Sequence, residues 1–126
     1  MKVLLDTNTF LWGLSAPEKL SLTARNAVSS SERHLSVASI WEVLIKVRVG
    51  KLPFPIRAGE YLTSQMSANG VTVLPIKLDH ALQIESLPMH HRDPFDRILI
   101  AQAMEEDWPI ITSDPMFKKY PVKVIW

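Results

Sequence analysis

Residues 3–8, VLLDTN, join a short apolar run to an acidic side chain near the start of the chain. An apolar run of this length predicts a buried β-strand. A carboxylate at its end is unfavourable by several kcal/mol if it stays buried without a partner. Asp6 is therefore a candidate site residue, placed where a strand ends.

Short apolar runs recur along the chain and alternate with helical patterns. The predicted strands cover residues 3–5, 34–37, 71–76, 110–112 and 122–125. The predicted helices cover residues 22–30 behind a Ser21 cap, 40–49 behind a Ser39 cap, 56–68, 78–87 and 94–107, with a short turn after Asp114. This alternation predicts an α/β domain with a mostly parallel central sheet of about five strands, covered by helices on both faces. Periodicity does not give the strand order.

The composition predicts one globular domain spanning residues 1–126, of which 47% are hydrophobic. Lysine and arginine number 14 against 13 acidic residues, so the net charge neither favours nor excludes a nucleic-acid partner. The chain has no cysteine, which excludes disulfides, thiolate catalysis and cysteine-based zinc sites. Asp6 comes too early for a signal peptide, and no run approaches the roughly 18 apolar residues of a membrane span. We expect a soluble, cytoplasmic protein with no membrane partner.

Four acidic residues are expected at one edge of the predicted sheet. Asp6 ends the first strand, Glu42 lies in the first turn of a predicted helix, and Asp114 follows the strand at residues 110–112. Asp96 lies in the first turn of the helix that Asp93 caps. Carboxyl ends of strands and N-termini of the following helices share one edge in such sheets. Singly, three of these acids have a local alternative: a capping box of Ser39 with Glu42, a dipole contact at Asp96, and a turn at Asp114.

Carboxylates gathered within a few ångströms repel one another, and their pKa values rise unless a cation neutralises them. Ligand sets made only of oxygen suit hard divalent cations such as Mg²⁺ or Mn²⁺, which substrate phosphates often complete. An ion held in this way can activate water and neutralise charge in phosphodiester hydrolysis. The four acids therefore predict a metal-dependent phosphodiesterase site.

Four blocks of the sequence resemble those of PIN-domain ribonucleases, in particular the VapC-type toxins of toxin–antitoxin pairs. The blocks are DTN at residues 6–8, SIWE at 39–42, DPFDR with LIAQA at 93–97 and 99–103, and TSDPMF at 112–117. The resemblance implies a parallel α/β/α sandwich and a Mg²⁺- or Mn²⁺-dependent endoribonuclease that hydrolyses RNA phosphodiester bonds as the toxin of a type II system. It also implies a VapB-like antitoxin that occludes the site, and a homodimer.

Carried over residue by residue, the resemblance implies that the catalytic, metal-binding acids are Asp6, Glu42, Asp96 and Asp114. Asn8 and Thr112 would orient these acids by hydrogen bonds. Asn8 has the alternative of capping the helix after Asp6, and Thr112 that of a plain strand residue. In the third block we favour Asp96 over Asp93 as the ligand, because Asp93 is at the cap and can serve as an outer contact.

Other polar residues are weaker candidates. The RNA-binding candidates are Arg97, Lys46 and Arg48, with Lys51, Lys118 and Lys119 behind them, and Arg97 is favoured over the rest. The four histidines form no HxxxH pair. His90 and His91 precede the Asp93 cap, and for them a solvated loop is favoured over a role near the site. Apolar residues 11, 12 and 14, together with residues 52–56, are a candidate groove for a partner peptide.

Two other functions remain open. An α/β chain of this length with an aspartate cluster around Mg²⁺ also describes a receiver-like signalling domain. It fits less well, because receiver domains have a phosphoacceptor aspartate after the third strand. Here the third predicted strand, residues 71–76, is followed by Lys77 and not by an aspartate. The other alternative is a catalytically inactive PIN-like module that binds RNA or protein.

Overall fold

The computed structural model describes residues 1–54 and 57–126. Its sheet has five strands in the order β3-β2-β1-β4-β5, and every neighbouring pair is parallel. The strands are β1 (Lys2–Leu5), β2 (Glu32–Ser36), β3 (Thr72–Leu74), β4 (Ile110–Ile111) and β5 (Val124–Ile125). The mostly parallel five-stranded sheet predicted from the sequence is confirmed.

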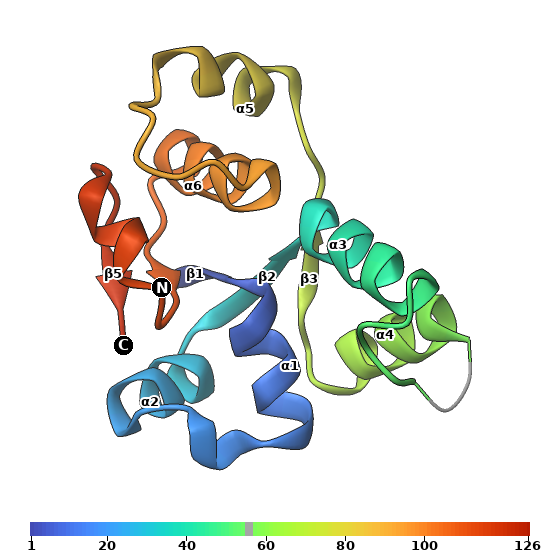
Figure 1. Ribbon diagram of the computed structural model, residues 1–126. Helices are drawn as coiled ribbons and strands as arrows, with labels where there is room; N and C mark the ends of the chain where they lie inside the picture. The colour runs from blue at the N-terminus through green and yellow to red at the C-terminus, as the bar shows by residue number, and fades with distance from the viewer. Residues whose placement is uncertain (55–56) are drawn as a thin grey trace.

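Helices connect the strands on both sides of the sheet (Figure 1). The α-helices are α1 (Thr7–Ser15), α2 (Leu22–Ser30), α3 (Val37–Arg48), α4 (Ala58–Ala68), α5 (Leu78–Gln83) and α6 (Pro94–Glu106). Short 3₁₀ helices are η1 (Pro17–Lys19), η2 (Ile84–Ser86) and η3 (Pro115–Lys119). Among the described residues, no helix is long and apolar enough to cross a membrane.

The alternation of side chains along the strands divides the core into two layers. Leu4 and Ile110 point to the face covered by α6, where they pack with Leu99 and Ile100. The alternate strand residues point to the other face and pack against α1, α2, α3 and α4. This second core includes Val3, Leu5, Ile111, Phe10, Ala24, Val43 and Leu62. The predicted three-layer α/β/α sandwich is therefore confirmed.

The strand order reverses direction at β1. The chain adds β2 and β3 on one side of β1 and then returns to add β4 and β5 on the other side. In open parallel sheets, ligands bind outside the carboxyl ends of strands at such a reversal. The receiver-like alternative is wrong, because flavodoxin-like receivers have the order 2-1-3-4-5.

The structure moves several predicted boundaries. The second strand ends at Ser36, whose Oγ accepts a hydrogen bond from the N–H of Ala38 at 3.0 Å, so Ser36 and not Ser39 caps α3. Helix α1 adds an element to the predicted list, and the predicted helix 78–87 is divided between α5 and η2. The predicted helix 56–68 is seen from Ala58, and its residue 56 lies outside the described residues.

Candidate functional site

One pocket at the carboxyl edge of the sheet collects acidic side chains from four separate segments. It has a volume of about 160 Å³, and we call it the acidic pocket. Its lining includes all four predicted metal ligands, Asp6, Glu42, Asp96 and Asp114, and also Thr7, Asn8, Lys46 and Asp93. The fold thus brings together the acids that the sequence analysis singled out.

Asp6 is held by both of its carboxylate oxygens. Oδ1 accepts a hydrogen bond from the N–H of Thr9 at 2.7 Å and caps α1, while Oδ2 accepts one from the hydroxyl of Thr112. The alternative that Asn8 caps this helix is therefore wrong. Burial raises the pKa of Asp6, and the neighbouring charge of Asp114 raises it further, although the hydrogen bonds from Thr112 and Thr9 oppose the shift.

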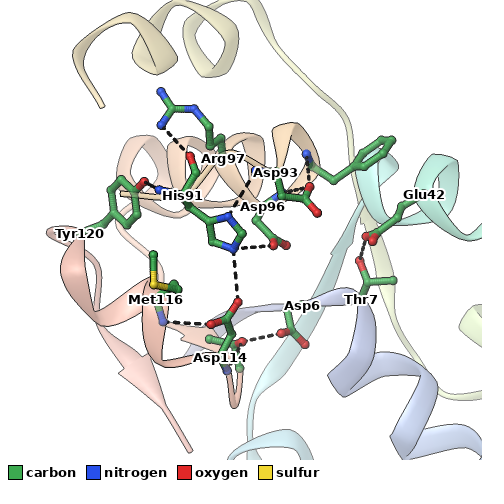
Figure 2. Close-up of polar contacts among 12 residues, drawn as sticks. Asp6, Thr7, Glu42, His91, Asp93, Asp96, Arg97, Asp114, Met116 and Tyr120 are labelled. Carbon is green, nitrogen blue, oxygen red and sulfur yellow. Dashed lines mark hydrogen bonds and ion pairs between the residues drawn. The ribbon is translucent and has the colours of Figure 1, made fainter. Parts of the chain in front are cut away.

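Glu42 lies in the second turn of α3, one turn later than predicted, because the helix begins at Val37. Its Oε1 accepts a hydrogen bond from the hydroxyl of Thr7 at 2.8 Å, and its Oε2 lies 2.9 Å from the Nζ of Lys46. The capping box with Ser39 is wrong, since Glu42 points to α1 and into the acidic pocket (Figure 2).

Asp93 and Asp96 divide two tasks at the start of α6. Asp93 Oδ1 accepts hydrogen bonds from the N–H groups of Phe95 at 2.8 Å and Asp96 at 3.2 Å, so it caps the helix. The Asp96 carboxylate is not used for the cap and lines the pocket. Burial, followed by the charge of Asp93, raises the pKa of Asp96 to about 7, although His91 opposes the shift.

Asp114 follows β4 and caps η3. Its Oδ1 accepts a hydrogen bond from the N–H of Met116 at 2.9 Å, and its Oδ2 faces His91. The hydroxyl oxygen of Thr112 accepts a bond from the N–H of Asp114 at 3.1 Å while it donates to Asp6. Thr112, which is buried, therefore ties two of the acids together.

Two threonines that sequence reasoning did not single out take the positions expected for Asn8. Asn8 is exposed at the pocket, whereas Thr7 contacts Glu42 and Thr9 contacts both Asp6 and the carbonyl of Ile111. Both threonines belong to the first turn of α1. The signal that could have revealed them is the recognition of Asp6 as an N-cap, which turns the next residues toward the site.

His91 also reaches the site, although the sequence analysis favours a solvated loop for it. The expected solvated loop is wrong for it, because its Nε2 lies 3.0 Å from Asp96 Oδ2 and 3.3 Å from Asp114 Oδ2 (Figure 2). Ligand atoms of these three residues lie within 4.8 Å of one another. The position of His91 just before the Asp93 cap is the sequence signal for a role near the site, and the structure favours this less preferred alternative.

Arg97, the favoured RNA contact, is turned into the protein instead. Its NH1 group donates hydrogen bonds to the carbonyl oxygens of Pro88 at 2.9 Å and His91 at 3.3 Å, and its NH2 group donates to that of Ile84 at 3.5 Å. The residue is buried. The prediction of RNA contact is wrong, because the guanidinium of Arg97 donates its hydrogen bonds to these carbonyl oxygens. These bonds hold the segment before α6.

Replacing Arg97 by methionine is expected to lower the free energy of unfolding by about 2 to 4 kcal/mol, since the carbonyl oxygens lose their buried donor. At about 4 °C per kcal/mol, the melting temperature falls by roughly 10 °C. Circular dichroism melts measure this. The matched control is Arg92→Met at an exposed neighbour, which should melt like the wild type. Equal melting temperatures for both variants would show that the contacts of Arg97 are dispensable.

Lys46 and Arg48, the other two leading basic candidates, differ in position. Lys46 lines the acidic pocket and pairs with Glu42, which places its charge beside any anion that enters. Arg48 is exposed in the last turn of α3, and RNA contact by this residue stays a prediction.

The donor set of the acidic pocket fits a hard divalent cation. It offers carboxylate oxygens from the residue after β1, from α3, from α6 and from the segment after β4. Two of the four acids have raised pKa values because burial and like charges disfavour their ionised forms. A cation stabilises these ionised forms. The arrangement can therefore hold Mg²⁺ or Mn²⁺ beside an entering phosphate group.

Comparisons with known proteins concern the family and the fold of the chain. The family model described as PIN domain matches residues 3–123. The chain is 28% identical over 121 residues to the ribonuclease VapC22 of Mycobacterium tuberculosis, covering 94% of this chain and 91% of that protein. VapBC2 of Rickettsia felis, solved bound to a promoter DNA fragment, superposes with a TM-score of 0.73 at 13% identity, over 98% of this chain and 97% of that one. VapC20 of M. tuberculosis, a toxin that cleaves the sarcin–ricin loop, superposes with a TM-score of 0.64 at 17% identity, over 93% of both chains.

Proposed function

Since this chain belongs to the PIN-domain family, we propose that it is a metal-dependent endoribonuclease and the toxin of a type II toxin–antitoxin pair. The observation that carries the proposal is the acidic pocket, where four carboxylates from distant segments meet at the reversal of the strand order. The similarity to the ribonuclease VapC22 over nearly the whole chain supports RNA as the substrate.

In the proposed reaction, Asp6, Glu42, Asp96 and Asp114 hold Mg²⁺ or Mn²⁺. A bound ion of this kind lowers the pKa of water and neutralises negative charge on phosphate oxygens. Thr112 and Thr7 keep Asp6 and Glu42 in orientation through their hydrogen bonds. Lys46 adds a positive charge on the pocket wall, which favours entry of an RNA phosphate.

The proposal predicts that cleavage of RNA stops when divalent cations are removed. Purified protein is incubated with labelled single-stranded RNA in Mn²⁺ or Mg²⁺, with and without EDTA, and the fragments are separated on a gel. We expect cleavage with either ion, loss of cleavage in EDTA and recovery when Mn²⁺ is restored. Mapping the cleaved ends identifies the sites.

The same assay separates the proposal from the inactive-module alternative. A protein that binds RNA and leaves it intact in Mn²⁺ and Mg²⁺ would be such a module. Cleavage that persists in EDTA would instead refute the role of the metal. The presence of all four carboxylates in one pocket favours turnover.

We propose a VapB-like antitoxin as the protein partner. An apolar groove of about 280 Å³ lies between α1 and the segment before α4, lined by Leu11, Leu14, Ser15, Leu52, Pro53, Phe54 and Tyr61. It includes part of the groove expected from the sequence; residues 55–56 of that expectation lie outside the described residues. Helix α1 connects this groove to the acidic pocket at Thr7, so an occupant can extend toward the acids. Co-expression with the candidate antitoxin and an RNA cleavage assay test this.

We also propose that the protein forms a homodimer. Trp41 is 57% exposed and contacts Phe95 edge to face at 5.2 Å. With Ile76 and Ile84 these aromatic residues line a second apolar groove, of about 250 Å³. Exposed apolar surface of this kind is typical of protein interfaces. Light scattering of the purified protein measures the oligomeric state, and a monomer at all concentrations would refute the dimer.

A further inference from the structure

Each polar atom of His91, in the main chain and in the ring, has a partner. Its main-chain N–H donates to the hydroxyl oxygen of Tyr120 at 2.8 Å, and its carbonyl accepts from Arg97 at 3.3 Å. Its ring Nδ1 accepts from the N–H of Asp93 at 3.2 Å, and its Nε2 faces Asp96 and Asp114. Figure 2 shows the contacts of the ring with Asp93, Asp96 and Asp114. Together these contacts fix the orientation of the His91 ring.

The contact with Asp93 determines which ring nitrogen carries the proton. A backbone N–H is always a donor, so Nδ1 has to be the acceptor and the neutral ring carries its hydrogen on Nε2. This N–H then points at Asp96 Oδ2, 3.0 Å away, and at Asp114 Oδ2, 3.3 Å away. Direct coordination of a metal by Nε2 requires the proton to leave that atom, and the contact between Nδ1 and Asp93 opposes the alternative tautomer.

We infer that His91 is a positioning residue, which holds the carboxylates of Asp96 and Asp114 at the separation and orientation that a divalent cation needs. The inference rests on the metal site of the proposed function and adds a residue that acts through the ligands. One donor shared by the Oδ2 atoms of two carboxylates offsets part of their repulsion. Groups that orient metal ligands typically change metal affinity by about 10- to 100-fold when removed.

Binding of Mn²⁺ to the whole protein without RNA tests this inference, measured by isothermal titration. In His91→Asn the shorter side chain can still accept from Asp93 but lacks a donor at the Nε2 position, and we expect the Kd for Mn²⁺ to rise about 10- to 100-fold. In His91→Gln the amide nitrogen takes the position of Nε2, and we expect an affinity close to that of the wild type. His90→Asn is the matched control, because His90 is exposed and packs on Tyr120 with a centroid distance of 5.4 Å.

Pulsed EPR of the Mn²⁺-loaded wild type gives an independent reading. A positioning residue leaves no strongly coupled nitrogen on the ion, whereas a directly bound imidazole produces one and overturns the inference. Unchanged affinity in His91→Asn, or equal losses in His91→Asn and His91→Gln, overturns it as well. Wild-type protein that binds no Mn²⁺ refutes the metal site of the proposed function. Binding that is intact in the wild type and in His91→Asn refutes only the role of His91.

Discussion

Replacing Asp6 by asparagine is expected to reduce RNA cleavage by at least about a thousandfold while the fold is retained. Asp6 lies at the reversal of the strand order, and a neutral amide removes one charge from the proposed ligand set. Asparagine caps helices about as well as aspartate, so the bond from Thr9 and the start of α1 survive. The cleavage rate is measured on labelled RNA in Mn²⁺, with circular dichroism as the measure of folding.

The matched control for this variant is Asp79→Asn. Asp79 is exposed in the first turn of α5, outside the acidic pocket. Its replacement removes the same charge near a helix N-terminus, although Asp79 is not a cap, and should leave the rate unchanged. Full activity in folded Asp6→Asn protein would end the assignment of the active site.

The second large effect is expected for Asp96→Asn, which should abolish cleavage and also stabilise the metal-free protein at pH 8. Burial and the charge of Asp93 raise the pKa of Asp96 to about 7 in the folded state, above its ordinary value of 3.8. The folded chain therefore binds this proton more tightly than the unfolded chain does. The stability that the proton contributes is present below pH 3.8 and is lost as the pH rises through 7.

The size of this stabilisation follows from the shift. About three pKa units at 1.36 kcal/mol each set an upper bound of about 4 kcal/mol at pH 8. The Asp96 side chain is 22% exposed, so solvent screening reduces this only in part. Melting curves in EDTA from pH 4 to pH 8 should show Asp96→Asn gaining on the wild type as the pH rises. Added Mn²⁺ should raise the melting temperature of the wild type more than that of the variant.

Asp93→Asn is the comparison that isolates Asp96. Asparagine keeps the cap of α6, so this variant should lose far less activity than Asp96→Asn. If Asp93→Asn is the more damaging of the two, Asp93 takes the place of Asp96 among the ligands. A variant Asp96→Asn that melts below the wild type at pH 8 in EDTA would show that ionised Asp96 does not destabilise the fold.

The sequence was sufficient for the sheet and for the acids because both depend on local rules. Apolar runs with helices between them imply a covered parallel sheet, and acids at strand ends share one edge of it. The strand order required the structure, since order depends on packing between distant segments. Asp6 and Asp114 follow β1 and β4, which are neighbours in the sheet although more than a hundred residues separate the two acids in the chain.

The errors concern side chains whose partners are not close in sequence. The guanidinium of Arg97 is a common phosphate-binding group. Only the structure shows that it donates instead to the carbonyl oxygens of residues 84, 88 and 91. His91 does lie in a loop, but the loop is not solvated at its ring, because the ring faces Asp114 at the start of η3. Ser39 is the predicted cap of helix α3, but the pairing of β2 with β3 extends to Ser36, and the helix begins directly after it.

Three carboxylates of the acidic pocket are also helix caps: Asp6 for α1, Asp93 for α6 and Asp114 for η3. Each uses one oxygen to accept a hydrogen bond from the first turn of its own helix, so the helix itself fixes the direction of the carboxylate. Under the proposed function, a divalent cation then enters a site whose ligands are already oriented, and its binding requires no refolding.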